Sequence, residues 1–222
     1  MQIGLVGLGK RGFNLVLNFK SKGIDVAAFD INKSTLDKIS KEGITTAPAI
    51  SDIALALRGR KVIWLMIPAG HVVEVVLNNL KYYLNPNDII IDGGNSHYKD
   101  TLARVRDLEK MGVHLLDCGT SGRVYGALKG VCTMIGGKKV VFEYCEDIFN
   151  SISVPDGYLY CGKTGNGHFT KMVHNGIEYG MMQAIAEGFE VLHRYDSGVD
   201  LAAVSKVWNH GSVVRSWLME LT

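Results

Sequence analysis

The stretch "QIGLVGLGKRG", Gln2 to Gly12, decides the fold of this chain. It starts with a short apolar run typical of a buried strand, and an amphipathic segment over 10–22 follows it. Between them, Gly7, Gly9 and Gly12 form the pattern G-x-G-x-x-G. Strand, tight turn and helix in this order are typical of the first unit of a dinucleotide-binding fold. The alternative is that these glycines serve only a tight turn.

Short strand-like runs and longer amphipathic runs alternate along most of the chain. The strand-like runs are 2–6, 25–29, 61–67, 88–92 and 113–117, and the helix-like runs are 10–22, 33–42, 71–83 and 98–111. This alternation indicates βαβ units and a mostly parallel sheet covered on both faces. The sequence therefore predicts an α/β fold.

The pattern changes after the strand-like run 157–161. From Asn166 onward it is typical of helix, to about Tyr195 and again from Val199 to about His210, and a breaker cluster of Gly, Lys and Thr precedes it. We therefore expect a Rossmann-type NAD-binding domain over residues 1–164. An all-helical domain, incomplete in this chain, is expected over residues 165–222.

Composition and charge exclude several classes of protein. The chain has 222 residues, of which 47% are hydrophobic and 21% charged, and a net charge of +2 spread along its length. We expect an ordinary globular protein that binds neither nucleic acid nor membrane. The apolar runs are too short to span a bilayer and no signal peptide precedes the first strand, so a cytoplasmic location is predicted. The four cysteines are well separated, which favours reduced thiols and no metal site.

Asp30 directly follows the second strand-like run, 18 residues after Gly12. A dinucleotide-binding fold places an acid there to accept hydrogen bonds from the ribose hydroxyls of NAD. The 2′-phosphate of NADP would meet a like charge, and Ile31 and Asn32 follow where an arginine would compensate. The sequence therefore favours NAD over NADP. The alternative is a solvated aspartate that caps the next turn.

Further polar loops follow the other strands. "MIPAG" (66–70) and "DGGNS" (92–96) belong on the cofactor side, because ligands of an open parallel sheet lie beyond the carboxyl ends of its strands. Alternatively, an Asn or Ser of the second loop caps the helix that begins near Tyr98. A third loop offers the Ser121 hydroxyl and the Gly122 backbone to a carboxylate. The expected cofactor contacts are Gly7, Leu8, Gly9, Lys10, Arg11, Gly12, Asp30, Met66, Ile67, Pro68 and Asn95.

Four polar residues of different chemistry share one face of the helix predicted after Asn166. At 100° per residue, His174, Asn175 and Glu178 lie about −60°, +40° and −20° from Lys171. A solvated charged stripe is the ordinary alternative. An ammonium, an imidazole, an amide and a carboxylate on one stripe favour a functional site.

These motifs together resemble the decarboxylating 6-phosphogluconate dehydrogenases. "GHFTKMVHNGIEYG" at 167–180 is close to that family's signature helix, and "DGGNSHYKDT", "GTSG" and "GLGKRG" stand in the family's order. Asp30 and "WLMIPAG" at 64–70 resemble its shorter, NAD-preferring branch. The wider β-hydroxyacid dehydrogenases share the glycine loop and a catalytic lysine but lack the "HNGIEYG" run.

The resemblance implies oxidative decarboxylation of 6-phosphogluconate to ribulose 5-phosphate. Lys171 would be the general base for the carbon-3 hydroxyl, and Glu178 would protonate carbon-1 after carbon dioxide leaves. This chemistry needs a lysine that is neutral at the start and a carboxylic acid that is protonated. The resemblance also implies a homodimer or higher homo-oligomer, and the following substrate contacts: Asn95, Ser121, Gly122, His174, Asn175 and, at the phosphate, Tyr179.

The chain departs from the family pattern in its substrate loop. Arg123 stands where the family's loop has a second glycine, so its side chain either crowds the substrate or adds a carboxylate contact. Arg11 is a milder departure.

The resembled family also continues past Thr222. We therefore expect a truncated enzyme, whose apolar residues Val213, Val214, Trp217, Leu218 and Leu221 need covering. Two other functions stay open: a non-decarboxylating 3-hydroxyacid dehydrogenase and a non-catalytic NAD sensor.

Overall fold

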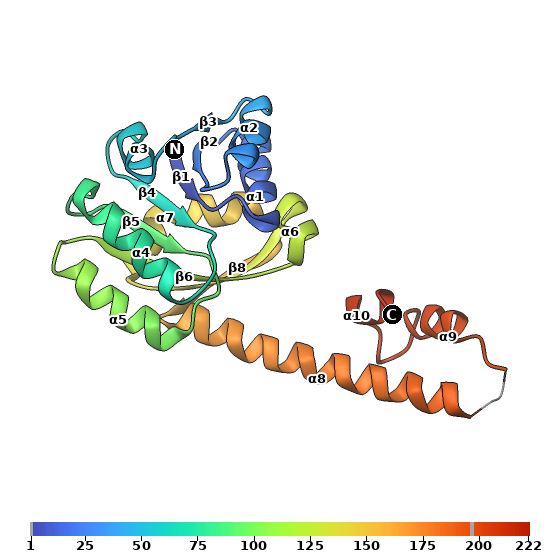
Figure 1. Ribbon diagram of the computed structural model, residues 1–222. Helices are drawn as coiled ribbons and strands as arrows, with labels where there is room; N and C mark the ends of the chain where they lie inside the picture. The colour runs from blue at the N-terminus through green and yellow to red at the C-terminus, as the bar shows by residue number, and fades with distance from the viewer. Residues whose placement is uncertain (1, 196–197) are drawn as a thin grey trace. The chain divides into compact units, whose positions relative to one another are not determined.

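The computed structural model of the chain describes residues 2–195 and 198–222 (Figure 1). The strands are β1 (Gln2–Val6), β2 (Asp25–Phe29), β3 (Thr45–Thr46), β4 (Val62–Leu65), β5 (Ile89–Asp92), β6 (His114–Ser121), β7 (Val131–Gly136) and β8 (Ser153–Gly162). The helices are α1 (Lys10–Ser21), α2 (Lys33–Lys41), α3 (Ile50–Ala56), α4 (His71–Leu80), the 3₁₀ turn η1 (Lys81–Tyr83), α5 (Tyr98–Glu109), α6 (Arg123–Lys129), α7 (Lys139–Ile152), α8 (Asn166–Arg194), α9 (Leu201–Trp208) and α10 (Trp217–Glu220).

The eight strands form a single sheet in the order β3-β2-β1-β4-β5-β6-β7-β8. Neighbours from β3 to β6 pair in parallel, β6 pairs antiparallel with β7, and β7 pairs in parallel with β8. The predicted α/β fold with a mostly parallel sheet is confirmed. Because β1 to β6 run in one direction, the loops after β1, β2, β4, β5 and β6 all emerge at one edge of the sheet.

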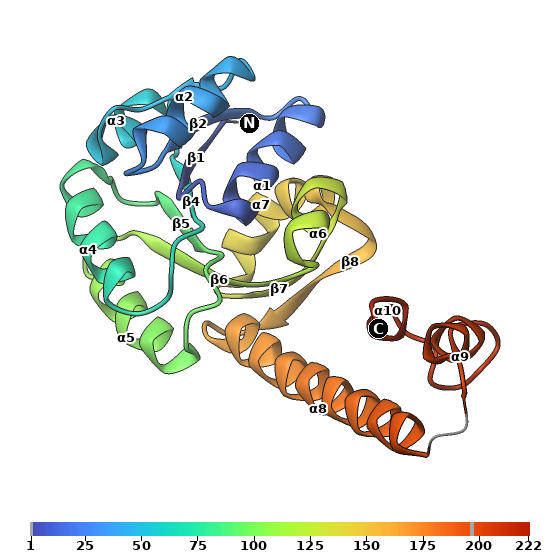
Figure 2. The ribbon, with the colours of Figure 1, turned by 45° about the vertical axis from the view of Figure 1, so that its right-hand side comes forward.

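Helices cover both faces of this sheet (Figure 2). Successive side chains of a strand point to opposite faces of the sheet, so the hydrophobic core has two parts. Ile89 and Ile91 pack with α1 and α7 on one face. Ile90 packs with α3, α4 and α5 on the other face. Trp64 is fully buried on the first face. Its ring centroid lies 5.7 Å from that of Phe19 and 5.6 Å from that of Phe149. Burial on both faces explains why the strands are continuous apolar runs.

The structure adds elements that the sequence pattern did not predict. These are β3, α3, α6, β7 and α7. β3 has only two residues, and β7 has six residues that end in Gly136. Neither strand is long enough to show a clear alternation of apolar and polar residues. β4 is shorter than predicted, because the strand ends at Leu65 and the loop begins with Met66.

The chain divides into two compact units, residues up to Met172 and Val173–Thr222, and α8 begins in the first. In the second unit, the Ser205 hydroxyl donates to the Met219 carbonyl at 2.8 Å. α10 is a helix of only four residues. The domain boundary expected at residue 164 stays a prediction.

The described residues hold neither a helix suited to span a membrane nor a cluster of metal-binding side chains. Residues 2–195 and 198–222 contain no helix that is long and apolar enough to cross a membrane. Within the same ranges, no three His, Cys, Asp or Glu side chains gather as a metal site would require. Val213, Val214, Trp217 and Leu221 are exposed, and Leu218 is half-buried.

Candidate active site

The glycine loop between β1 and α1 is folded tightly against the loop after β4. Gly7 has φ 99°, and a Cβ atom there would lie 2.5 Å from the carbonyl oxygen of Met66. A Cβ atom at Gly12 would overlap the Gly7 carbonyl, whereas at Gly9 it would meet no atom within 4 Å. Two of the glycines are thus required by packing, and the third faces open space from which a ligand can approach the backbone.

The N-terminus of α1 is suited to an anion. Its N-cap is Gly9, no side chain caps it, and its first turn holds no acidic residue. The first N–H groups of a helix have no partner within the helix, and the helix dipole makes this end positive. Lys10 is exposed and Arg11 half-buried at this end. Such a terminus fits a pyrophosphate, as the sequence predicts.

Asp30 follows β2 and is tied to the glycine loop. Its Oδ2 accepts the backbone N–H of Leu8 at 2.6 Å, and its Oδ1 accepts the N–H of Asn32 at 2.8 Å. The capping alternative therefore describes part of its role, because Oδ1 closes the turn before α2. The backbone N–H of Leu8 in the glycine loop thus has its hydrogen-bond acceptor in the Asp30 carboxylate.

The loops after β4 and β5 lie against each other. A Cβ atom at Gly94 would lie 2.5 Å from the carbonyl oxygen of Ile67, and one at Gly93 would overlap the indole nitrogen of Trp64. Met66 and Ile67 are half-buried in this contact and Pro68 is exposed. Gly94 is therefore required where the two backbones approach each other, and Gly93 is required where its backbone lies against the Trp64 side chain.

Asn95 links the β5 loop to β6. Its φ is 57°, its Nδ2 donates to the Thr120 carbonyl at 3.1 Å, and its Oδ1 accepts the Thr120 N–H at 2.8 Å. The alternative that an Asn or Ser of this loop caps α5 is wrong, because the N-cap is His97, whose ring accepts the N–H of Lys99 at 3.3 Å. Asn95 instead holds two strand ends together.

Lys171 is buried against β6. It is 6% exposed, and a Cβ atom at Gly119 would overlap the Cβ of Lys171. Because side chains of a strand alternate, Gly119 and Ser121 lie on the same face of β6. Cys132 of β7 pairs with Ser121. Burial raises the pKa of the Cys132 thiol, and the charge of Lys171 partly offsets this. Lys171 and Ser121 thus belong to one side of the sheet.

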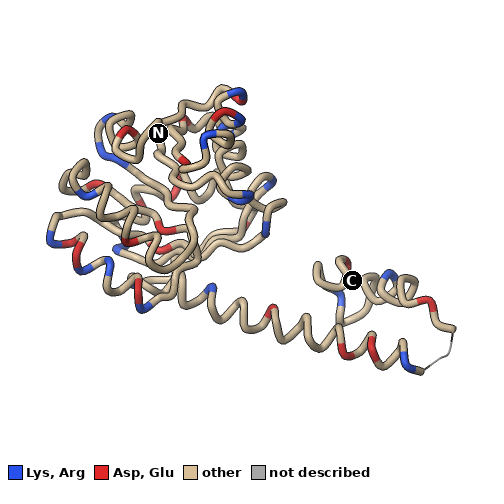
Figure 3. Tube along the Cα trace, in the orientation of Figure 1, with Lys and Arg blue, Asp and Glu red and all other residues tan. Residues whose placement is uncertain are grey.

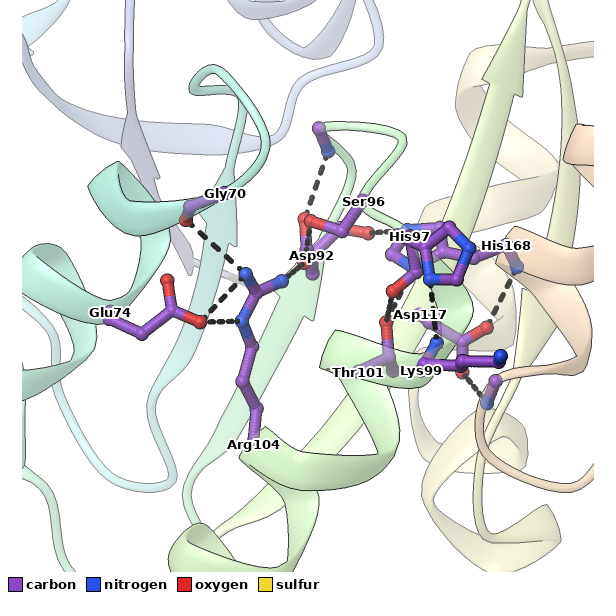
Figure 4. A network of polar contacts seen from close by, with 12 residues as sticks. Gly70, Glu74, Asp92, Ser96, His97, Lys99, Thr101, Arg104, Asp117 and His168 are labelled. Atoms are coloured by element: carbon purple, nitrogen blue, oxygen red, sulfur yellow. Dashed lines mark hydrogen bonds and ion pairs between the residues drawn. The ribbon is translucent and has the colours of Figure 1, made fainter.

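A polar network surrounds these loops (Figure 4). The carboxylate of Asp92 accepts the Gly94 N–H at 3.1 Å and the Ser96 hydroxyl at 2.7 Å, and its Oδ2 lies 3.2 Å from the Arg104 guanidinium. Arg104 also pairs with Glu74 at 2.9 Å. Asp92 and Arg104 are both buried, so each supplies the charge that the other needs in a medium of low dielectric constant.

The first turn of α8 is held by three other elements. The carboxylate of Asp117 accepts the N–H of Gly165 at 2.7 Å and that of His168 at 2.9 Å. The His168 ring lies 3.0 Å from the Asp92 carbonyl and 2.8 Å from the Thr101 hydroxyl. Sequence reasoning did not single out Asp117, Thr101, Arg104 or His168. The local signal in the sequence was an acid at the end of two successive strand-like runs, 88–92 and 113–117.

Four further residues predicted for the site lie in the second unit, on α8: His174, Asn175, Glu178 and Tyr179. The His174 Nδ1 lies 3.7 Å from the carboxylate of Glu178 and 3.3 Å from the amide oxygen of Asn175. The Glu178 side chain is 28% exposed, and Tyr179 is exposed. Lys171 and Glu178 are the first two charged residues of α8 (Figure 3). Their roles stay predictions.

The loop after β6, which the sequence predicts to bind substrate, has an unusual backbone. Gly122 has φ 113° and Arg123 has φ 55°. The left-handed region favours glycine, so the arginine occupies a conformation that suits the glycine of the family pattern. Its side chain is exposed.

Comparison with known proteins gives the same family over the whole chain. Residues 2–163 match the NAD binding domain of 6-phosphogluconate dehydrogenase, and residues 167–222 match the 6-phosphogluconate dehydrogenase C-terminal domain. The NAD(+)-dependent, decarboxylating 6-phosphogluconate dehydrogenase of Haloferax volcanii is 42% identical over 224 residues, covering 100% of this chain and 73% of that protein. The NADP(+)-dependent enzyme of Bacillus subtilis is 38% identical over 231 residues, covering 100% and 49%.

A solved structure agrees with these relatives. The 6-phosphogluconate dehydrogenase of Plasmodium falciparum superposes with a TM-score of 0.92 at 31% identity, covering 100% of this chain and 50% of that one. The family models together cover nearly all of the sequence, in the order of the two compact units. This chain therefore belongs to the 6-phosphogluconate dehydrogenase family.

Proposed function

We propose that this protein carries out the oxidative decarboxylation of 6-phosphogluconate with NAD. The observation that carries the proposal is a series of contacts along the carboxyl edge of the parallel strands. Gly7 packs on the loop of Met66 and Ile67, Ile67 packs on Gly94, and Asn95 binds Thr120. Beside Thr120, Gly119 packs on Lys171. A cofactor held at the glycine loop and a substrate held at Lys171 would therefore share one edge of the sheet.

The glycine loop and the N-terminus of α1 would hold the cofactor. Open space at Gly9 and the uncapped positive helix end fit the pyrophosphate of a dinucleotide. Bound NAD would supply the hydride acceptor. Asp30 would meet the ribose hydroxyls, and its negative charge supports NAD over NADP. Relatives of both cofactor types exist, so this choice rests on Asp30.

Lys171 would take the proton from the carbon-3 hydroxyl while hydride leaves the same carbon. The resulting 3-keto acid loses carbon dioxide, and the protonated lysine would stabilise the enediolate that forms. Glu178 would then protonate carbon-1 to give ribulose 5-phosphate. The burial of Lys171 supports this role, because a charge that changes during the reaction is felt most strongly away from water.

The remaining predicted residues would bind the sugar acid. Ser121 and Gly122 would contact the carboxylate, His174 and Asn175 the hydroxyls, and Tyr179 the phosphate. Asn95 would contribute with its remaining hydrogen-bonding capacity, since Thr120 occupies one donor and one acceptor position of its amide. A homodimer or higher oligomer and a cytoplasmic location complete the proposal.

Incubation of the protein with 6-phosphogluconate and either NAD or NADP tests the proposal. We expect reduced cofactor and carbon dioxide in equal amounts, with faster turnover on NAD. The matched control is Lys171→Met, which should lose turnover and retain its affinity for NAD, because the glycine loop is unchanged. Reduction of NAD without release of carbon dioxide would identify a 3-hydroxyacid dehydrogenase. Binding of NAD without turnover of any sugar acid would instead support the function of a non-catalytic NAD sensor.

A further inference from the structure

We infer that Thr101, His168 and Asp117 are positioning residues that hold Lys171 in place for proton transfer. The inference rests on the proposed function, since it assigns these residues a part in the same reaction. None of the three is expected to touch substrate or cofactor. They act through the first turn of α8, and Lys171 follows in the next turn, three residues after His168.

Asp117 fixes the start of the helix. Its two carboxylate oxygens accept the N–H groups of Gly165 and His168, so it serves the free donors at the N-terminus of α8 although it lies 48 and 51 residues earlier in the chain. Its negative charge is also favourable at the positive end of the helix. Asp117 is fully buried on β6, two residues before Gly119, so the strand that caps α8 is also the strand against which Lys171 packs.

His168 fixes the rotation of the helix about its axis. The Asp92 carbonyl can only accept, so the Nε2 of His168 donates to it at 3.0 Å. For the neutral ring, Nδ1 then accepts from the Thr101 hydroxyl at 2.8 Å. His168 is 2% exposed, and its two ring contacts hold it between the end of β5 and α5. Residues three apart on a helix are neighbours on its surface, so a rotation that moved Lys171 would break both ring contacts.

The same contacts connect Lys171 to the loop that carries Asn95. Asp92 binds His168 through its carbonyl, and its carboxylate binds the Gly94 N–H and the Ser96 hydroxyl on either side of Asn95. The base and a predicted substrate contact are therefore held by one residue at the end of β5. Displacement of a catalytic group by about 1 Å can cost on the order of a hundredfold in rate.

Thr101→Val is the sharpest test, because valine keeps the shape of the side chain and removes only the hydroxyl. Thr101→Ser restores the hydroxyl and is the matched control. The first readout needs no turnover: acetylation of lysines by a water-soluble N-hydroxysuccinimide acetate, followed by mass spectrometry of the peptides. Lys163 is exposed just before α8 and serves as the internal reference. We expect Lys171 to be acetylated several-fold faster in Thr101→Val than in the wild type, and Thr101→Ser to react at the wild-type rate.

The second readout is steady-state kinetics with 6-phosphogluconate and NAD. We expect Thr101→Val to lower kcat on the order of tenfold to a hundredfold, with the KM for NAD unchanged and recovery in Thr101→Ser. Unchanged acetylation of Lys171 in Thr101→Val would overturn the inference, whatever the kinetics. If acetylation responds as expected but the wild type turns over no sugar acid, the proposed function fails and the positioning of Lys171 stands.

Discussion

The carboxylate of Asp30 accepts the backbone N–H of Leu8 at 2.6 Å, which joins the end of β2 to the middle of the glycine loop. The residue expected to select NAD therefore also shapes the loop that would hold the pyrophosphate. A substitution at this position changes both properties unless it keeps an acceptor for Leu8. Asparagine keeps one oxygen that can accept the Leu8 N–H and removes the charge, although its NH₂ group replaces the oxygen that accepts the Asn32 N–H.

Asp30→Asn should narrow the preference for NAD over NADP by on the order of tenfold, because the repulsion of a 2′-phosphate is lost. Asp30→Gly should narrow it too and should also lower the free energy of unfolding by about 1–2 kcal/mol, since the Leu8 N–H loses its partner. Dissociation constants for both cofactors and urea unfolding of each variant separate the two effects. If Asp30→Asn kept the full wild-type preference for NAD over NADP, the charge of Asp30 would have no part in cofactor selection.

Glu178→Gln tests the proposed acid. Glutamine keeps the size of the side chain and cannot supply the proton, so steady-state turnover should fall by about a hundredfold or more. Reduction of NAD in a single turnover should be affected much less, because hydride transfer precedes protonation of carbon-1. Stopped-flow absorbance compared with the steady-state rate measures the difference. Equal losses in both would place Glu178 at the hydride step or in substrate binding.

Gly119→Ala should displace the first turns of α8. The added methyl group would overlap the Cβ of Lys171 and lie 2.8 Å from the Gly167 carbonyl, so we expect a loss of about 1–3 kcal/mol in stability and a large loss of kcat. Gly126→Ala, in α6, is the control. Its Cβ atom would lie 3.7 Å from the Ser121 carbonyl oxygen, an ordinary van der Waals contact. Urea unfolding and turnover of both variants check the expectation. A fully active Gly119→Ala protein would contradict the packing described for Lys171.

Arg123 carries a conformational cost that depends on its Cβ. At φ 55° a β-branched residue is strongly disfavoured, so Arg123→Val should destabilise the protein by about 1–2 kcal/mol. Arg123→Gly should be close to neutral, because relief of the left-handed conformation offsets the greater freedom of glycine in the unfolded chain. The side chain is exposed, so packing contributes little to the comparison. Urea unfolding midpoints of Arg123→Val and Arg123→Gly measure this difference in stability. Equal stabilities of the two variants would argue against a left-handed backbone conformation at residue 123.

Cys145 should make stability sensitive to alkaline pH. Burial raises the pKa of its thiol to about 12, partly offset by the charge of Arg60. An unfolded thiol loses its proton near pH 8.5, so the contribution of Cys145 is complete below that pH and declines as the pH rises toward 12, by at most about 1.4 kcal/mol per pH unit. In Cys145→Ala the free energy of unfolding should therefore fall less steeply above about pH 8.5. Urea unfolding across this range measures the slopes, and parallel slopes would contradict the shift.

The sequence predicted the features that depend on neighbours along the chain. The alternation of apolar runs gave the mostly parallel sheet, and the spacing of Gly7, Gly9 and Gly12 gave the turn from β1 into α1. Residues three, four and seven apart placed His174, Asn175 and Glu178 on one face of the helix that begins at Asn166. Each of these properties follows from the period of a strand or helix, which a few consecutive residues reveal.

Only the tertiary structure showed what holds the site together. Asp117 meets Gly165 across 48 residues, and His168 meets Asp92 across 76. Asn95, which is predicted to contact a ligand, also binds the backbone of Thr120. Such pairings leave no periodic signal, because they depend on which strand ends become neighbours when the sheet forms. A buried carboxylate or imidazole has to find a partner there, and the order of the strands in the sheet decides which partner is within reach.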